Sequence, residues 1–284
     1  MKTILFTIIL LLSISFVNAQ HKYAYQLYNA QGVKVSYENM LSDFQNNDII
    51  LFGELHNNPI AHWLQYEVSL DLIAESQLVF GAEMFEADNQ HALILYLQDS
   101  IDYKGLDSLA RLWNNYKTDY APLVNLAKEN KQPFIATNIP RRYANMVFKK
   151  GFEILDSLSS QEKSWIAPLP IEYDPELPGY KNMLNMMEGH GGENLPKAQA
   201  IKDATMAYFI AQNYKPGKKF IHFHGTYHTD NYEGILWYLK KLLPDVKYVT
   251  ISTVLQSDVN NLEKENIGKA DFIICVDEDM TTTY

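Results

Sequence analysis

The sequence predicts an α/β fold, with a mostly parallel sheet flanked by helices. Short apolar runs alternate along the chain with segments of helical periodicity, and the runs are bounded by Gly, Pro or polar residues. Such runs are typical of parallel strands buried on both faces, and their alternation with helices favours a parallel sheet. A chain of 284 residues is long enough to build one such domain around a full core.

Six apolar runs are the predicted strands of this sheet. They cover residues 49–52, 78–80, 133–137, 220–224, 247–252 and 271–276. We also expect a β-hairpin near the start of the domain, at 25–28 and 33–35, because these two segments flank a turn that ends in Gly.

Helices are expected after the first four of these runs. In the first helix Asn58 is a favoured cap and Pro59 a favoured first residue. The helix after the third strand is expected to stop at Gly151. In the helix after the fourth strand, Asp230 and Glu233 have the spacing of a capping box.

Residues 152–216 break the alternation, because they contain no convincing strand. A Pro-rich stretch leads to a helical segment over 180–188, a Gly-rich turn, and a long helix over about 196–213. We therefore expect a helical cap, inserted over the carboxyl edge of the strands and belonging to the same domain.

The first nineteen residues have the parts of a secretory signal peptide. Lys2 supplies the positive end, residues 4–16 the apolar core, and Ala19 the small residue before cleavage. No Cys lies near this point to accept a lipid, and no later segment approaches about 18 uninterrupted apolar residues. We therefore expect a signal peptide at 1–19 and a single soluble domain at 20–284, periplasmic or secreted.

Composition narrows the range of ligands. The formal net charge of −10 argues against nucleic acid, whose phosphates are bound by Lys and Arg. The 19 Tyr and 13 Phe suit a flat hydrophobic ligand, although core packing accounts for most of them.

Two Gly-x-x-His motifs mark the predicted site. One runs from Gly53 to His56 after the first strand, and the other from Gly225 to His228 after the fourth. In open α/β sheets ligands bind beyond the carboxyl ends of the strands, so both motifs aim His and Glu side chains at one edge. The second and third strands end in further functional groups. We therefore expect one cleft lined by Glu54, His56, Glu83, Arg141 and His228.

Two interpretations of this cleft stay open. Two His and two carboxylates suit a divalent first-row metal, bound by His56, His228, Glu54 and Glu83. The same side chains can instead form a hydrogen-bonded network in the core. Both arrangements need the two turns to approach closely, which the glycines of the motifs allow.

Five segments, in this order, resemble the ChaN-like haem-binding uptake proteins, in the superfamily that includes Tiki proteases and erythromycin esterases. They are GELHNNP at 53–59, EMF at 83–85, NIPR at 138–141, AQAIKDATMA at 198–207 and GTYH at 225–228. The resemblance runs from about residue 48 to residue 245. Many members of the family are lipoproteins, and this chain departs from them in having no lipid-site Cys.

The resemblance implies an exported haem carrier that takes part in haem or iron acquisition. It implies an outer-membrane haem receptor system as a partner, and a homodimer whose interface holds the haem. It implies a Tyr ligand to ferric iron, which a hard phenolate suits, and basic or His groups near the propionates. In the predicted cap Tyr180 is the candidate ligand, with Tyr173 in reserve. His190 and Lys181 are the other candidate haem-binding residues.

The hydrolases of the same superfamily give a second interpretation, an esterase or peptidase. Glu54 or Glu83 would then act as a general base on water, while His56 and His228 would bind a metal or stabilise an oxyanion. The sequence does not separate a catalytic cleft from a retained scaffold, so carrier and enzyme both stay open.

Overall fold

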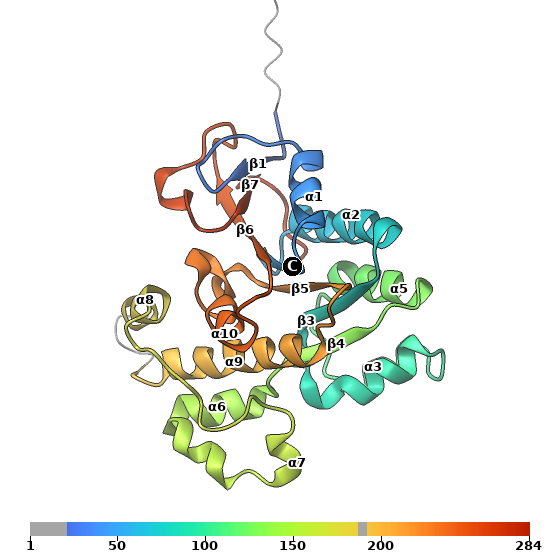
Figure 1. Ribbon diagram of the computed structural model, residues 1–284, viewed down its shortest axis with the longest axis vertical. Coiled ribbons are helices and arrows are strands. Elements are labelled where there is room, and N and C mark those ends of the chain that lie inside the picture. Colours follow the sequence, from blue (N-terminus) through green and yellow to red (C-terminus); the bar gives the residue numbers. More distant parts are fainter. Residues whose placement is uncertain (1–21, 187–191) are drawn as a thin grey trace, which may run out of the picture.

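The protein is described by a computed structural model that covers residues 22–186 and 192–284. The predicted signal peptide and His190 lie outside the described residues. The domain is built on a seven-stranded sheet in the order β1-β7-β6-β2-β5-β3-β4, in which β1 is antiparallel to β7 and the other pairs are parallel (Figure 1). Its strands are β1 Tyr25–Asn29, β2 Ile49–Glu54, β3 Leu78–Glu86, β4 Phe134–Asn138, β5 Lys219–Gly225, β6 Tyr248–Gln256 and β7 Phe272–Asp277.

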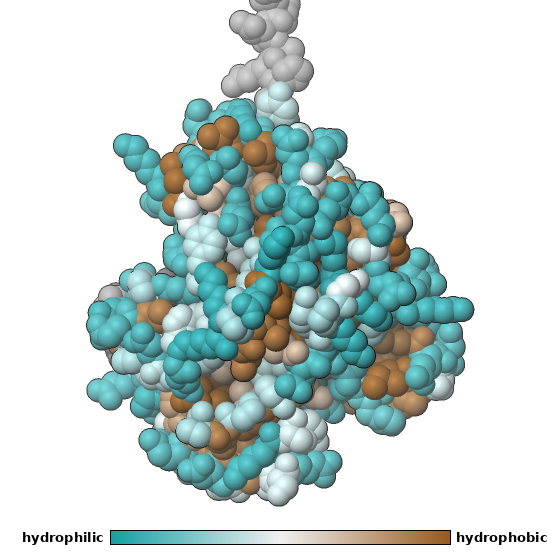
Figure 2. Space-filling model, viewed as in Figure 1, coloured by the Kyte–Doolittle hydropathy of each residue, from teal (hydrophilic) through white to brown (hydrophobic). Residues whose placement is uncertain are grey.

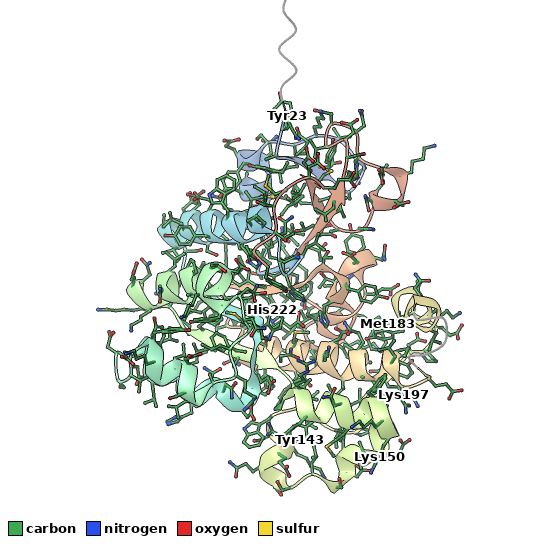
Figure 3. The ribbon with its side chains drawn as sticks, turned by 180° about the vertical axis from the view of Figure 1, so that it is seen from behind. Tyr23, Tyr143, Lys150, Met183, Lys197 and His222 are labelled. Atoms are coloured by element: carbon green, nitrogen blue, oxygen red, sulfur yellow. The ribbon has the colours of Figure 1, made fainter. Side chains whose placement is uncertain are left out.

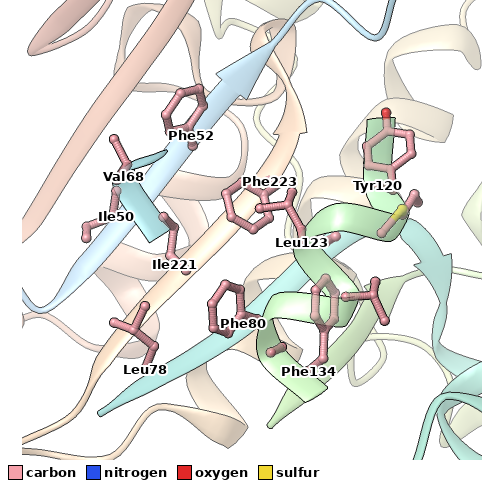
Figure 4. Close-up of a cluster of buried hydrophobic side chains, with 14 of the residues drawn as sticks. Ile50, Phe52, Val68, Leu78, Phe80, Tyr120, Leu123, Phe134, Ile221 and Phe223 are labelled. Carbon is pink, nitrogen blue, oxygen red and sulfur yellow. The ribbon is translucent and has the colours of Figure 1, made fainter. Parts of the chain in front are cut away.

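Helices cover both faces of the sheet. On one face α1, α2, α3 and α5 pack on alternate side chains of the central strands, in the cluster that Figure 4 shows around Phe52, Phe80 and Phe223. On the other face α9 and α10 pack on the intervening side chains, among them Leu51 and Phe220. The helices are α1 Tyr37–Gln45, α2 Pro59–Glu75, α3 Gln90–Leu97, α4 Tyr103–Leu109, α5 Ala121–Glu129, α6 Arg141–Lys150, α7 Ser160–Lys163, α8 Pro178–Met186, α9 Leu195–Asn213 and α10 Ile235–Leu242.

Short helical turns lie between these elements: η1 Ala87–Asn89, η2 Tyr116–Tyr120, η3 Phe152–Ser157, η4 Thr226–His228, η5 Asp230–Tyr232 and η6 Lys264–Asn266. No helix in the described part of the chain is long and apolar enough to cross a membrane.

The α/β architecture agrees with the prediction, and each of the six predicted strands is present with shifted ends. The cap of α2 is also confirmed, because the side chain of Asn58 accepts a hydrogen bond of 2.9 Å from the backbone N–H of Ala61. The helix α6 ends as expected before Gly151, whose φ of 79° lies in the left-handed region that favours glycine.

One local prediction is wrong, and another is confirmed only in a shorter form. Asp230 caps no helix; its Oδ1 accepts hydrogen bonds from the hydroxyls of Thr226 and Ser252, while Glu233 accepts one from the backbone N–H of Gly179. Both residues of the expected capping box therefore make other hydrogen bonds instead of capping the helix. The N-terminal hairpin is present in a short form: the backbone N–H groups of Asn29 and Val35 donate to the carbonyls of Val33 and Leu27, and Tyr28 and Lys34 form one antiparallel bridge, while the opposite edge of β1 pairs with β7.

The predicted cap at 152–216 contains no strand among its described residues, but its parts lie in different places. The segment η3 and α7 packs with α6 in a small separate core around Val147, Leu155 and Ile166 (Figure 1). The helix α9 belongs to the layer on the sheet, where Met206 and Ile210 are buried. The helix α8 and the first half of α9 are the parts that supply side chains to the carboxyl edge.

Candidate functional site

The two Gly-x-x-His motifs meet at the carboxyl end of β5. Strand β5 lies between β2 and β3, and Glu54 pairs in register with Gly225. A Cβ atom placed on Gly225 would lie 2.9 Å from Nε2 of His56 and 3.6 Å from Oε2 of Glu83. The structure therefore brings Glu54, His56, Glu83 and His228 together around this one glycine.

Glu54 and His56 form the first half of the site. Nδ1–H of His56 donates to Oε1 of Glu54 at 3.0 Å, and the same oxygen accepts from the hydroxyl of Tyr120 at 2.5 Å. The side-chain amide of Gln65 donates to Oε2 of Glu54. Burial raises the pKa of Glu54, but His62 and His56 outweigh it and hold this pKa below its usual value. Glu54 is thus a buried carboxylate with a full set of donors.

The imidazole of His56 is the exposed part of this half. Its side chain is 37% exposed, against 1% for Glu54, and it packs edge-on against Trp113. Burial lowers the pKa of His56, but the carboxylates of Glu54 and Glu83 outweigh burial and raise it above the usual value. Since Nδ1 carries the proton that Glu54 accepts, Nε2 of the neutral ring is left with its lone pair.

The loop that carries His56 is fixed through its backbone. The carbonyl of His56 accepts hydrogen bonds from Nε2–H of His62 at 3.1 Å and from the side-chain amide of Asn115 at 2.8 Å. Nδ1 of His62 faces the amide oxygen of Gln65 at 3.1 Å. Both ring nitrogens of His62 thus face oxygen atoms, and these contacts hold the loop that carries His56.

His228 forms the second half with two carboxylates. Nδ1 is hydrogen-bonded to Asp203, and Nε2 lies 3.2 Å from Oε1 of Glu83. Burial lowers the pKa of His228, but Glu83 and Asp203 together raise it to about 9. Burial raises the pKa of Glu83, yet His228 outweighs it and holds this pKa well below the usual value. His228 is therefore an imidazolium clamped between two buried acids.

The other predicted site residues, Tyr180, Lys181 and Arg141, do not lie together. Tyr180, 4% exposed, donates its hydroxyl to Oδ2 of Asp203 at 2.8 Å, and burial and Asp203 raise its pKa. Lys181 is half-exposed and pairs with Glu176 on the surface. Arg141 is exposed at the first position of α6, and in the described structure it makes no hydrogen bond or ion pair with the four central residues.

The predicted divalent-metal site is not supported. Among residues 22–186 and 192–284, no three His, Cys, Asp or Glu side chains are arranged to hold a metal ion. The physical reason is that the carboxylates accept N–H groups from the imidazoles: both nitrogens of His228 face acids, and Nδ1 of His56 faces Glu54. The hydrogen-bonded network is the interpretation that the geometry matches.

A chain of hydrogen bonds runs behind the site along β5 and fixes two further histidines, of which His222 lies at the centre of the molecule (Figure 3). Thr137 donates to the carbonyl of Ala82 at 3.0 Å, so its oxygen accepts Nε2–H of His222 at 2.7 Å. Nδ1 of His222 then accepts from Nδ1–H of His224 at 3.0 Å, and Thr229 donates to Nε2 of His224 at 2.9 Å. Burial lowers the pKa of both rings, that of His224 to about 3, so both are neutral.

Sequence reasoning named no role for Asp203, Gln199 or Tyr120, although each touches a central residue. A signal was present for the first two. Gln199 and Asp203 are spaced four apart on α9, so they lie on one face of the helix, and both are buried. Buried polar residues at that spacing indicate a shared partner, here His228.

Comparison with known proteins gives the same superfamily. The family model for haem-binding uptake proteins of the Tiki superfamily, ChaN, matches residues 40–239. The structure that describes cofacial haem binding to ChaN of Campylobacter jejuni is 18% identical, covers 88% of this chain and 96% of that chain, and has a TM-score of 0.65. None of the curated proteins matches the chain.

Two further solved structures share the fold. An erythromycin esterase in its open conformation is 9% identical, with 89% of this chain and 97% of that chain covered and a TM-score of 0.53. A Bacillus cereus protein is 11% identical, with 89% and 94% covered and a TM-score of 0.51. The family match spans well over half of the chain and contains both Gly-x-x-His motifs. This chain therefore belongs to the haem-binding uptake family of the Tiki superfamily, ChaN.

Proposed function

We propose that this protein is an exported haem-binding protein that takes part in haem or iron acquisition. The family match over residues 40–239 carries the proposal. The similarity to ChaN of Campylobacter jejuni, which is described with cofacial haem, supports it. A carrier of this kind needs an iron ligand, an apolar surface for the porphyrin, and cations for the propionates.

The segment around α8 has side chains that fit these needs. Leu184 is exposed on α8, and Lys181 is exposed on the same helix. Figure 3 shows Met183 on α8 and Lys197 at the start of α9 toward the same side of the molecule. The proposed haem lies against this apolar and basic segment, with a Tyr ligand.

Two tyrosines are candidates for that ligand. Tyr180 gives its hydroxyl to Asp203, so it can bind iron only after that hydrogen bond is released. Tyr173 is more exposed, and its ring centroid lies 5.6 Å from that of Tyr180. Release of the hydrogen bond between Tyr180 and Asp203 would therefore decide which of the two phenols faces the haem.

A hemin titration of residues 20–284 tests the carrier function. We expect a saturable Soret shift at micromolar hemin and the charge-transfer band of ferric tyrosinate. Tyr173→Phe or Tyr180→Phe should abolish that band, while Tyr103→Phe, on α4, should leave it intact. The absence of any Soret shift would remove the carrier function, and a spectrum unchanged in both variants would remove these two ligands.

Export is the part of the proposal that depends on residues 1–19. We expect the protein recovered from the periplasm or medium of its expressing cells to begin at Gln20. Mass spectrometry of the intact chain measures this directly, and a periplasmic chain that still begins at Met1 would contradict the proposed cleavage.

The Glu54–His56 pair supports a second function, hydrolysis of an ester. His56 is exposed, bonded through Nδ1 to a buried carboxylate, and its pKa is raised. Its Nε2 would take a proton from water as the water oxygen bonds to the ester carbon. The C–O bond to the alcohol then breaks, and the alcohol leaves with that proton.

Hydrolysis of p-nitrophenyl acetate tests this second function. His56→Ala should lower kcat/KM by about 100-fold or more, and Glu54→Gln should lower it as well. His91→Ala, which changes an exposed histidine of α3, serves as the control. A wild-type rate no higher than that of His56→Ala would exclude hydrolysis at this site.

A further inference from the structure

A cavity of about 810 Å³ lies beside the edge strand β4, between α3 and the C-terminal end of α9. Its apolar wall is formed by Ile94 and Leu97 of α3, Phe134 and Ile135 of β4, and Phe209 of α9. Figure 2 shows apolar surface over α3 on this side of the molecule. The volume is within the roughly 300–1,000 Å³ of small-molecule sites. The cavity shares no lining residue with the site around Gly225.

The polar backbone of the edge strand is already satisfied inside this cavity. The side-chain amide of Gln90 donates to the carbonyl of Phe134 at 3.0 Å, and its oxygen accepts the N–H of Ala136 at 2.7 Å. An unpaired edge would make an apolar ligand costly, because covering free N–H and C=O groups removes their water. With Gln90 in place, an apolar body can cover β4 without that cost. The same two bonds block a peptide from adding a strand here.

The rim of the cavity carries positive charge on a chain whose net charge is −10. Lys128 and Lys131 lie at the rim with one acid, Asp99. The ammonium of Lys128 lies 2.7 Å from Oδ1 of Asp99 and 4.1 Å from the ring centroid of Tyr96. The side chain of Lys128 is 20% exposed and that of Asp99 is 81% exposed. The ammonium is thus held in place, while its partner is solvated and easily replaced by another carboxylate.

We propose that this cavity binds a small amphipathic carboxylate. Its apolar ring or chain lies between Ile94 and Phe209, and its carboxylate takes the place of Asp99 at Lys128. The lining contains no Tyr, His, Cys or Met, the side chains that ligate haem iron. This site is therefore separate from the proposed haem site and does not depend on it.

Fluorescence of 8-anilinonaphthalene-1-sulfonate, an aromatic anion, tests the proposal on residues 20–284. We expect saturable binding, displaced by dodecanoate but not by dodecyltrimethylammonium, both below their micellar concentrations. Ile94→Glu should weaken dye binding at least tenfold. Leu70→Glu is the matched control, because Leu70 is 42% exposed on α2 and Ile94 is 39% exposed on α3. Lys128→Met should weaken displacement by dodecanoate about fivefold or more.

The proposal is overturned if Ile94→Glu binds the dye as wild type does, or if the cation displaces the dye as well as dodecanoate does. Circular dichroism shows whether each variant is folded. If Ile94→Glu does not fold, Lys128→Met, a change at the rim, tests the proposal independently through the displacement by dodecanoate. Hemin titration of Ile94→Glu should give the wild-type Soret response. Loss of dodecanoate binding with haem binding intact is therefore distinct from failure of the carrier function.

Discussion

At the scale of single residues, Gly225 is the position around which the side chains of the site pack. Its φ of −59° is open to any residue, so the requirement for glycine is one of space. A Cβ atom there would lie 2.9 Å from the imidazole of His56. We expect Gly225→Ala to displace that ring from Glu54 and to lower the free energy of unfolding by about 1–3 kcal/mol. Urea unfolding followed by circular dichroism measures the change.

The double variant Gly225→Ala with His56→Ala is the control for this explanation. Without the imidazole the added methyl group has room, so the cost of Gly225→Ala should fall in the His56→Ala background. An equal cost in both backgrounds would mean that the approach of His56 to Gly225 is not the cause.

The sequence was enough to predict that four site residues lie close together, because each is near the carboxyl end of a parallel strand. They are Glu54, His56, Glu83 and His228. Parallel strands place their carboxyl ends at one edge, whatever the helices do. Asp203 and Tyr120 come from helical segments, and which way a helical side chain points depends on how the helix packs. The hydrogen bond between Tyr180 and Asp203 could not be predicted for the same reason. The two residues lie on different helices, and their separation along the chain does not show that they meet.

At the scale of elements, the edge strand β4 shows how one side chain can make the backbone hydrogen bonds that a neighbouring strand would make. Gln90 bonds the carbonyl of Phe134 and the N–H of Ala136, two groups that point away from β3. We expect Gln90→Ala to lower the free energy of unfolding by roughly 1–3 kcal/mol, because two backbone groups lose their partner. It should also promote self-association through the open edge.

Urea unfolding and size-exclusion chromatography with light scattering measure the two effects. Gln98→Ala, which changes an exposed glutamine just after α3, should alter neither. A Gln90→Ala protein as stable and monomeric as this control would show that water replaces the side chain without loss.

Capping residues show which element features a sequence can predict. Asn58 caps α2 as expected, since its partner Ala61 is three residues away and no distant group competes for it. Asp230 had the same local pattern, but Thr226 and Ser252 donate to it instead. Local patterns predict local bonds, and they fail where a distant strand brings a better donor.

At the scale of the whole molecule, the clamped imidazolium makes stability depend on pH. The pKa of His228 is about 9 in the folded protein, against 6.5 for an unperturbed histidine. A raised pKa stabilises the fold fully below the unfolded value, and this contribution is lost as pH rises through the folded value. We expect the free energy of unfolding to fall between pH 6.5 and 9, by on the order of 3 kcal/mol. Urea unfolding at a series of pH values measures it.

Asp203→Asn is the variant that tests the origin of this slope. It removes one of the two acids that hold the proton on His228, so the decline between pH 6.5 and 9 should become shallower. His91→Ala should keep the wild-type slope. A flat wild-type profile would mean that His228 is neutral in the folded protein.

The order of the strands has a consequence for how the chain is made. Strand β2 has β5 and β6 as its neighbours in the sheet, and both are synthesised after β3 and β4. A growing chain therefore carries the apolar β2 without a neighbouring strand until residue 225 has left the ribosome. Contacts between segments so far apart in the sequence form slowly. For the export that we propose, this delay keeps the chain unfolded for longer, which is the state in which a secretory channel accepts it.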